Sequence, residues 1–223
     1  MKNLVILAVL VLVLFSINLS ASVGKEYGTF KVTQFPFNVY TDAPSRLNLA
    51  ILSGWMGDIR NLKIDKLCTK NPNSGKSSMR VSYQVITKTE NKAVGVYMQQ
   101  NPASRLATLR GGYDLTKASK ISFYARGENG NEVVEFKMVT AKEQNLLASS
   151  KVSRKITLTK EWKKYELDLS NTEYKDISGG LGFVIHTRDN REGVIFYLDD
   201  IAYTRDADRM TEAKVTAENN KVN

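Results

Sequence analysis

From about residue 28 onward, hydrophobic and polar residues alternate along the chain with a period of two. In the segment 79–85, for example, Met79, Val81 and Tyr83 alternate with Arg80 and Ser82. Segments that alternate in this way, or that are rich in strand-favouring residues, cover 29–34, 62–65, 79–85, 94–99, 121–126, 134–138, 154–159, 162–169, 181–187 and 193–204. Because a strand turns alternate side chains to one face, this pattern predicts about ten strands and no helix of roughly ten or more residues.

Turn-forming residues separate the predicted strands. The segment Asn71–Gly75 reads Asn-Pro-Asn-Ser-Gly, in which Pro restricts φ and both Asn and Gly tolerate positive φ. The segment Arg126–Asn131 has Asn-Gly near its end and predicts a hairpin loop. Many short strands joined by regular turns indicate an all-β fold, built as an antiparallel sandwich or barrel.

The segment 193–204 has the composition of a strand but contains two adjacent carboxylates, Asp199 and Asp200. Consecutive residues of a regular strand point to opposite faces, so only one of the two is expected to face the core. A buried carboxylate costs several kcal/mol unless it is paired, hydrogen-bonded or bound to a metal. The strand therefore predicts either a calcium site or a metal-free network that joins an aspartate to Arg or to the backbone.

The two ends of the chain differ from this central region. Lys2, the apolar run 4–15 and the small or polar residues up to Ser22 form the tripartite pattern of a secretory signal peptide. The apolar run is shorter than the ~20 residues that a transmembrane helix needs, so no membrane span is expected after cleavage. We therefore expect a signal peptide at 1–22, a single domain at 23–207 and a polar, disordered tail at 208–223. This organisation predicts a secreted, periplasmic or cell-surface protein.

The formal net charge is +9, so anionic partners are expected. Export makes nucleic acid a poor candidate and leaves anionic glycans or lipid. The alternative is that the scattered basic residues serve solubility only. The single cysteine, Cys68, excludes an intrachain disulfide and leaves stability to the hydrophobic core.

The residues that enzymes use are sparse, and we expect no catalytic activity. His186 is the only histidine, so a nucleophile–histidine unit has one possible base and a zinc site lacks ligands. Glycoside hydrolysis needs two carboxyl groups that face one bond. Glu132 and Glu135 lie three residues apart in a predicted strand and would face opposite sides.

Several segments, in order along the chain, resemble exported β-sandwich modules with a galactose-binding-like, jelly-roll fold. They are Ser53–Asp58, Asn71–Gly75, Gly95–Gln99, Gly111–Thr116, Phe123–Glu128, Glu132–Lys137, Trp162–Ser170 and the closing strand 193–204. The resemblance implies a single-domain antiparallel jelly-roll sandwich of the carbohydrate-binding-module type. This chain departs from the pattern where Met98 and Tyr124 stand at positions that often hold Trp. If those Trp residues stack on sugar rings, the ligand of this chain differs or is bound weakly.

A sugar site needs a flat aromatic side chain and polar groups that converge on a concave surface. Outward-facing positions of the predicted strands, with one aromatic residue in a glycine-flanked loop, supply these groups. The candidate ligand-binding residues are Trp55 in that loop, Tyr97, Gln99, Tyr124, Arg126 and Glu135. The alternatives are cross-strand packing for the tyrosines, a plug over one end of the sandwich for Trp55, and an ion pair with Glu128 or Glu135 for Arg126.

The resemblance also implies a structural Ca²⁺ at the closing strand, bound together with residues from the first strand and a loop. The ligands it implies are Asp200 or Asp199, with Asp42 and Asp58 as co-ligands. Ca²⁺ takes six to eight oxygen ligands from carboxylates, carbonyls and water, which these residues could supply in part.

Together these features predict an exported, non-catalytic module that binds carbohydrate, either a glycan or a cell-surface polysaccharide, stabilised by calcium or by a metal-free network at the closing strand. Its basic charge would suit an anionic polysaccharide. The alternative is a structural or adhesive cell-surface protein that uses the same sandwich to contact other proteins.

Overall fold

The protein is described here by a computed structural model that covers residues 30–45, 48, 50–100, 113–138, 152–169, 177 and 179–206. The predicted signal peptide and polar tail lie outside the described residues. In the part of the chain that the structure describes, no helix is both long and apolar enough to cross a membrane.

The described residues form thirteen strands and one short 3-10 helix, η1 (Ile59–Asn61). The strands are β1 (Phe30–Lys31), β2 (Phe37–Tyr40), β3 (Ala50–Gly57), β4 (Leu62–Cys68), β5 (Ser78–Tyr83), β6 (Ala93–Gln100), β7 (Tyr113–Asp114), β8 (Lys120–Gly127), β9 (Val133–Met138), β10 (Val152–Thr157), β11 (Lys163–Asp168), β12 (Gly179–His186) and β13 (Val194–Thr204).

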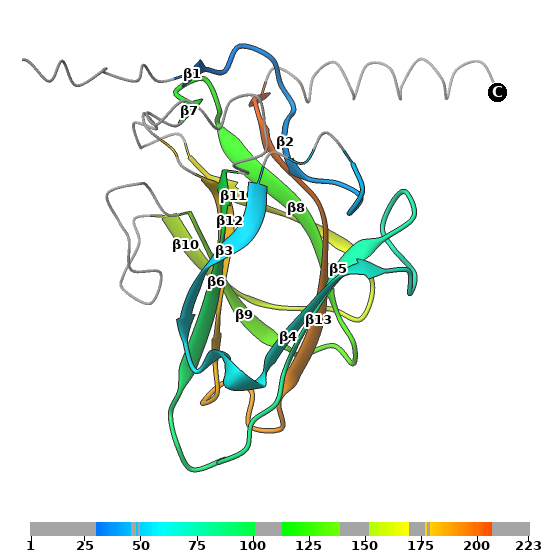
Figure 1. Cartoon of the computed structure of the whole chain (residues 1–223), viewed down its shortest axis with the longest axis vertical. Helices are drawn as coiled ribbons and strands as arrows, with labels where there is room; N and C mark the ends of the chain where they lie inside the picture. The colour runs from blue at the N-terminus through cyan, green and yellow to red at the C-terminus, as the bar shows by residue number, and fades with distance from the viewer. Residues whose placement is uncertain are drawn as a thin grey trace, which may run out of the picture.

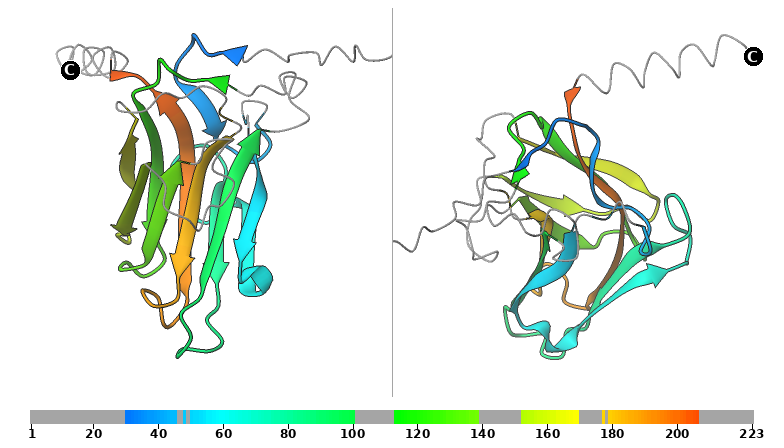
Figure 2. Two further views of the ribbon diagram at one scale, coloured as in Figure 1. Left: turned by 90° about the vertical axis from the view of Figure 1, so that its left-hand side faces the viewer. Right: turned by 45° about the horizontal axis from the view of Figure 1, so that its top comes forward.

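Two antiparallel sheets face each other (Figures 1 and 2). The five-stranded sheet has the order β10-β9-β12-β6-β3, and the six-stranded sheet has the order β11-β8-β13-β5-β4, with β2 paired to β13. A short parallel pair of β1 and β7 lies beside them. This arrangement confirms the predicted all-β antiparallel sandwich.

Aromatic residues from both sheets meet in the core between them. Phe196 of β13 packs edge-on against Phe136 of β9 and Phe183 of β12, with ring centroids 6.3 and 5.2 Å apart. Phe123 of β8 packs against Phe136 at 4.6 Å. All four rings are fully buried. Such pairs add about 0.5–1.5 kcal/mol each beyond their burial, so the two sheets share one core.

All ten segments predicted from the alternation contain strands, and three further strands were not predicted. The unpredicted strands are β2, β3 and β7. The prediction that Trp55 lies in a loop is wrong, because Trp55 belongs to β3. Glycines on either side of Trp55 suggested a loop, but Gly54 pairs with Tyr97 of β6. A Cβ at Gly54 would lie 3.0 Å from the Tyr97 Cβ, so glycine permits this close strand pairing.

The turn predicted near Asn131 forms, but it does not close a hairpin. Gly130 and Asn131 adopt positive φ angles of 81° and 72°. The strands that this turn connects, β8 and β9, belong to different sheets. The same local turn chemistry thus carries the chain from one layer of the sandwich to the other.

Candidate functional site

The six predicted ligand-binding residues are divided between the two sheets. Trp55, Tyr97, Gln99 and Glu135 belong to the five-stranded sheet, and Tyr124 and Arg126 belong to the six-stranded sheet. Because the sheets face each other across the core, the structure does not bring the six residues together on one surface. Their role in ligand binding stays a prediction.

On the five-stranded sheet, Tyr97 keeps only 4% of its surface exposed and packs with Val184 and Met56. Its ring therefore takes part in side-chain packing on this sheet, as the alternative interpretation of Tyr97 expected.

Glu135, on the same sheet, is surrounded by donors. It contacts His186 at 3.1 Å, Lys137 at 3.3 Å and the Ser153 hydroxyl at 2.5 Å. Burial favours a higher pKa for Glu135, but the hydrogen bonds from Ser153 and His186 and the charge of Lys137 together lower that pKa. These contacts make Glu135 part of an internally satisfied polar network.

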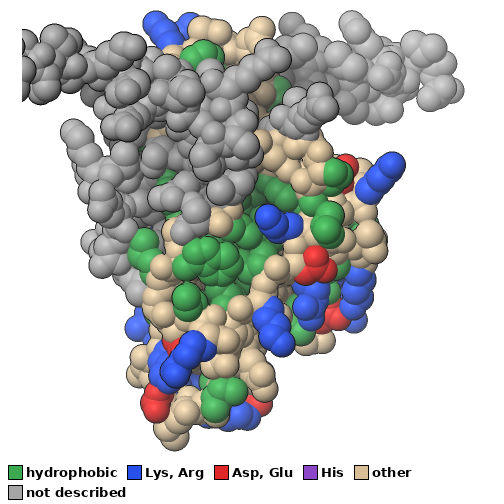
Figure 3. All heavy atoms as spheres, viewed as in Figure 1, with side chains coloured by type: hydrophobic (Ala, Val, Ile, Leu, Met, Phe, Trp, Pro, Cys, Tyr) green, Lys and Arg blue, Asp and Glu red, His purple; other side chains and the backbone are tan. Residues whose placement is uncertain are grey.

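Trp55 lies at the edge of the five-stranded sheet. It pairs with Val96, whose side chain is buried in the core, and directly paired residues of a sheet share a face. Trp55 is therefore on the core side of β3, with 43% of its surface exposed at the edge. Figure 3 shows hydrophobic side chains gathered between the two sheets on this side of the molecule.

On the six-stranded sheet, Arg126 packs between two aromatic rings. Its guanidinium carbon lies 3.8 Å from the Tyr197 ring centroid and 5.3 Å from that of Trp162. Its Nη2 donates to the Lys70 carbonyl at 3.2 Å, and only 6% of the residue is exposed. Instead of the ion pair with Glu128 or Glu135 considered from the sequence, Arg126 forms a buried cation–π stack.

Tyr124 lies two residues before Arg126, on the same outer face of β8, and is partly exposed. It pairs with Asp199 of β13 and with Lys164 of β11 in the sheet register.

The expectation that Asp199 and Asp200 point to opposite faces is wrong. Asp200 has a φ of +48°, and the pairing of β13 with β8 shifts register after Asp199. This bulge turns both carboxylates toward the loop between β4 and β5 (69–77, the β4–β5 loop). Asp199 Oδ2 accepts hydrogen bonds from the backbone N–H groups of Asn73 and Ser74, at 3.0 and 3.3 Å. Asp200 accepts from the Asn73 amide at 2.8 Å and the Ser74 hydroxyl at 2.9 Å.

Asp42 holds the other end of the β4–β5 loop. Its Oδ1 accepts from the backbone N–H groups of Lys76 and Ser77, both at 2.8 Å, and these bonds lower its pKa. Gly75 has a φ of +60°, and a Cβ there would lie 2.1 Å from the Asp42 carboxylate. Three aspartates from β13 and the β2–β3 connection thus hold one loop through N–H and O–H donors.

Asp58, the fourth predicted calcium ligand, lies in a different environment. It accepts from the Tyr83 hydroxyl at 3.2 Å and lies 3.5 and 3.6 Å from Arg60 and Lys92. Among the described residues, no group of three or more acidic, histidine or cysteine side chains is arranged to hold a metal ion. Asp58 therefore lies apart from the other three aspartates, Asp199 joins a network with the backbone of the β4–β5 loop, and calcium binding stays a prediction.

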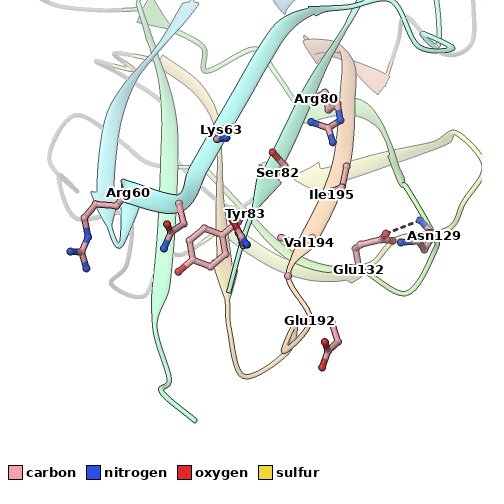
Figure 4. Close-up of a pocket in the computed structure, with 13 residues that line it drawn as sticks. Arg60, Lys63, Arg80, Ser82, Tyr83, Asn129, Glu132, Glu192, Val194 and Ile195 are labelled. Carbon is pink, nitrogen blue, oxygen red and sulfur yellow. Dashed lines mark hydrogen bonds between the residues drawn. The ribbon is translucent and has the colours of Figure 1, made fainter. Parts of the chain in front are cut away.

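A groove of about 650 Å³ opens on the outer face of the six-stranded sheet; we call it the basic groove (Figure 4). Its lining includes Lys63 of β4, Arg80 and Ser82 of β5, Ile195 of β13, and Asn129 and Glu132 of the β8–β9 connection. In the sheet register, Lys63 pairs with Ser82, and Ser82 pairs with Ile195. These three residues form one row across the floor, while the β8–β9 connection forms a wall.

Two cations of the basic groove, Lys63 and Arg80, have no ion pair with any residue that the structure describes. Arg80 hydrogen-bonds the Tyr197 hydroxyl, next to the Arg126 stack. Arg60 instead pairs with Asp58, and Figure 4 shows its side chain directed away from the other labelled residues. Lys and Arg side chains are visible along the β4–β5 side of the molecule in Figure 3.

Glu132 lies in the wall and is 93% buried, with its 7% exposed fraction at the groove. Its Oε1 accepts from the Asn129 backbone N–H at 2.8 Å, while its Oε2 has no hydrogen-bond partner in the described structure. The carboxylate sits over Gly127, where a Cβ would lie 1.7 Å from Oε2. Glu132 therefore fixes the wall against the end of β8.

The residues of the basic groove were not predicted as a site. The alternation along 79–85 does place Arg80 and Ser82 on the outer face of their strand. However, nothing in the sequence pairs them with Lys63 or Ile195, because that depends on the order of strands in the sheet.

No protein-family model matches the chain, and no curated protein matches it. Solved structures do resemble it. A family 30 carbohydrate-binding module aligns with a TM-score of 0.50 at 14% identity, covering 76% of this chain and 98% of the module. A family 11 carbohydrate-binding module from Clostridium thermocellum, solved with a β-1,3-1,4-mixed-linked tetrasaccharide, aligns at 0.45 and 18% identity, covering 74% and 92%.

The glycoside hydrolase domain of Endo-D from Streptococcus pneumoniae R6 also aligns, with a TM-score of 0.49 and 15% identity. That alignment covers 67% of this chain and only 21% of the hydrolase structure. At these identities the likeness establishes the fold alone. The chain therefore has the β-sandwich fold found in carbohydrate-binding modules.

Proposed function

We propose that this protein is a non-catalytic carbohydrate-binding module and that the basic groove is its glycan site. The observation that carries the proposal is an open groove built on paired strands and lined by side chains that can bind hydroxyl groups. The fold shared with carbohydrate-binding modules supports the same class of function. Within that class, an anionic polysaccharide matches the charge of the groove.

The floor of the basic groove supplies what a sugar ring requires. Ser82 can donate to and accept from a ring hydroxyl, and the neighbouring Gln84 adds an amide. Ile195 lies between them and the wall, where it offers an apolar surface to the C–H face of a ring. Because Ser82 and Ile195 project from paired strands, they are held rigidly and lose little freedom when a ligand binds.

Each of the two carboxylates that line the groove makes a contact with another residue. Glu132 is buried in the wall and accepts from Asn129, while Glu192 is exposed and pairs with Lys88. Glycoside hydrolysis needs two carboxyl groups at one bond, and we propose no such role for this pair.

A glycan array on the purified protein tests this proposal. The groove variant is Ser82→Phe, which fills the floor with a bulky side chain on the outer face of β5. The matched control is Thr157→Phe, the same kind of change at an exposed position of the five-stranded sheet. We expect wild type and Thr157→Phe to bind the same glycans and Ser82→Phe to lose about tenfold or more in affinity, since steric exclusion removes the ring contacts.

Unchanged binding by a folded Ser82→Phe variant would contradict the groove as the site. Absence of binding to any glycan, together with capture of a protein partner, would favour the adhesive alternative. Trp55→Ala is a second control: the proposal expects unchanged affinity, because Trp55 lies on the other sheet.

We propose a structural calcium ion separately, on the basis of the family resemblance alone. The described contacts do not bring the four aspartates together at one site. If the ion stabilises the fold, exhaustive chelation will lower the melting temperature and added Ca²⁺ will restore it. An unchanged melting temperature would contradict a structural calcium ion.

A further inference from the structure

The charge of the basic groove is not neutralised by its neighbours. Lys63 has no carboxylate within ion-pair distance in the described structure, and neither has Arg80. Asp65 stands opposite Arg80 in the register, but its Oδ1 accepts from the Leu67 backbone N–H at 2.9 Å. A cation that is not held in an ion pair stays available to attract a ligand anion.

Neither carboxylate that lines the groove forms an ion pair with Lys63 or Arg80 in the described structure. Glu192 forms an ion pair with Lys88, which lies outside the lining. Glu132 is buried in the wall. The open part of the groove therefore presents two cations, with the Ser82 hydroxyl and the Ile195 side chain beside them (Figure 4).

The spacing of the two cations suits one acidic ring. Lys63 pairs with Ser82, and Arg80 lies two residues before Ser82 on the same face of β5. Diagonal neighbours of this kind have Cβ atoms about 7–8 Å apart, so their long side chains can reach the same or adjacent anionic groups. The Arg fork binds an anion through two parallel hydrogen bonds, and Lys adds a point charge.

We propose that the basic groove binds an acidic glycan, with Lys63 and Arg80 recognising its carboxylate or sulfate groups and Ser82 and Ile195 contacting the ring. This inference rests on the proposed carbohydrate-binding function and specifies its ligand class. The two cations favour acidic glycans over neutral glycans, while Ser82 and Ile195 on the floor contact glycans of either kind.

Matched ligand pairs test the selection. The first pair is polygalacturonate and its methyl ester, which share a backbone and differ in charge. The second is dextran sulfate and dextran. We expect the full-length protein to bind the charged member of at least one pair about tenfold or more tightly, and to lose most of that preference when salt rises from about 0.05 to 0.5 M.

The variants Lys63→Gln and Arg80→Gln test whether the preference for charged glycans comes from the basic groove. Each variant keeps a polar side chain on the outer face of the sheet, so the fold is retained, as circular dichroism will verify. We expect each to lose about fivefold to tenfold in affinity for the charged member, while binding to the neutral member stays unchanged. Lys117→Gln, an exposed lysine outside the groove lining, is the charge-matched control and is expected to bind as wild type.

The outcomes separate this inference from the proposed function. Equal binding of charged and neutral members overturns the acidic-glycan inference but keeps carbohydrate binding. No binding of any glycan overturns both. Duplex DNA binding as tight as that of the charged glycan, with the same loss in Lys63→Gln, also overturns the inference, because it would mean general attraction of polyanions.

Discussion

Arg126 illustrates how one buried side chain orders its surroundings at the scale of a residue. Its guanidinium packs on Tyr197 and Trp162 and binds the Lys70 carbonyl. Trp162 in turn donates to the Asn71 carbonyl at 2.8 Å. The stack thereby joins β8 and β13 to the start of the turn at Asn71.

Replacing Arg126 by Met tests this stack. Met retains the bulk but loses the charge and the hydrogen bond, and we expect the free energy of unfolding to fall by about 2–4 kcal/mol. Arg154→Met, at an exposed position of β10, is the control and is expected to change it by less than about 0.5 kcal/mol. Urea unfolding gives both values, and equal effects at the two positions would show that the stack adds nothing.

Asp199 gives the protein a pH-dependent stability. Burial raises the pKa of Asp199 to about 7, and the neighbouring charge of Asp200 adds to the rise. The unfolded chain releases this proton near pH 3.8, so the folded state binds more protons between pH 3.8 and about 7. The free energy of unfolding is therefore expected to fall by about 2–4 kcal/mol as pH rises through this window.

Urea unfolding at several pH values between about 5 and 8 measures this effect. Asp200→Asn removes the neighbouring charge, and Asn tolerates the positive φ of this position, so we expect a shallower slope in that variant. Asp206→Asn, an exposed change, should keep the wild-type slope. Stability that rises with pH across this range would contradict the assignment to Asp199.

At the scale of elements, the connection between β8 and β9 shows how a turn and a side chain depend on each other. The turn crosses from one sheet to the other, and Glu132 packs over the Gly127 backbone at the end of β8. A Cβ at position 127 would force that carboxylate to move from its observed position. The same carboxylate accepts from Asn129 and supports the wall of the basic groove.

A double-mutant cycle tests this dependence. Gly127→Ala places a Cβ 1.7 Å from the Glu132 carboxylate, which must move, and we expect a loss of about 1–3 kcal/mol of unfolding free energy. In a Glu132→Ala background the same change should cost much less, because the clash is gone. Gly130→Ala is the comparison within the same turn: its positive φ costs about 1 kcal/mol in either background. Additive effects of the Gly127 and Glu132 changes would contradict the clash.

At the scale of the whole molecule, the two sheets are joined by a shared core, and one of the two tryptophans reports on each sheet. Trp55 belongs to β3 of the five-stranded sheet, while Trp162 packs on Tyr197 of the six-stranded sheet. Because Phe196 contacts rings from the opposite sheet, neither sheet can lose its packing alone.

Single-tryptophan variants test this cooperativity. Trp162→Phe leaves Trp55 to report on the five-stranded sheet, and Trp55→Phe leaves Trp162 to report on the other. In each variant we expect the fluorescence transition in urea to coincide with the transition followed by circular dichroism, as two-state unfolding requires. A fluorescence midpoint separated from the circular dichroism midpoint would mean that the sheets unfold independently.

The fold class and most strand positions follow from local sequence, because the alternation of buried and exposed side chains is a local property. Alternation placed Val81 and Phe123 in the core and Arg80 on the outer face before any strand pairing was known. It missed β3, since the glycines around Trp55 are common both in loops and in closely paired strands.

Which outward side chains meet depends on how distant strands are paired in the folded molecule. Tyr97 and Arg126 both face outward from their strands, yet they lie on different sheets, so the predicted sugar site was not assembled. The bulge at Asp200 likewise overrode the strand alternation and turned two carboxylates to one loop. The basic groove depends on β4, β5 and β13 being neighbours, and that order is set by long-range packing of the two sheets, which no local pattern encodes.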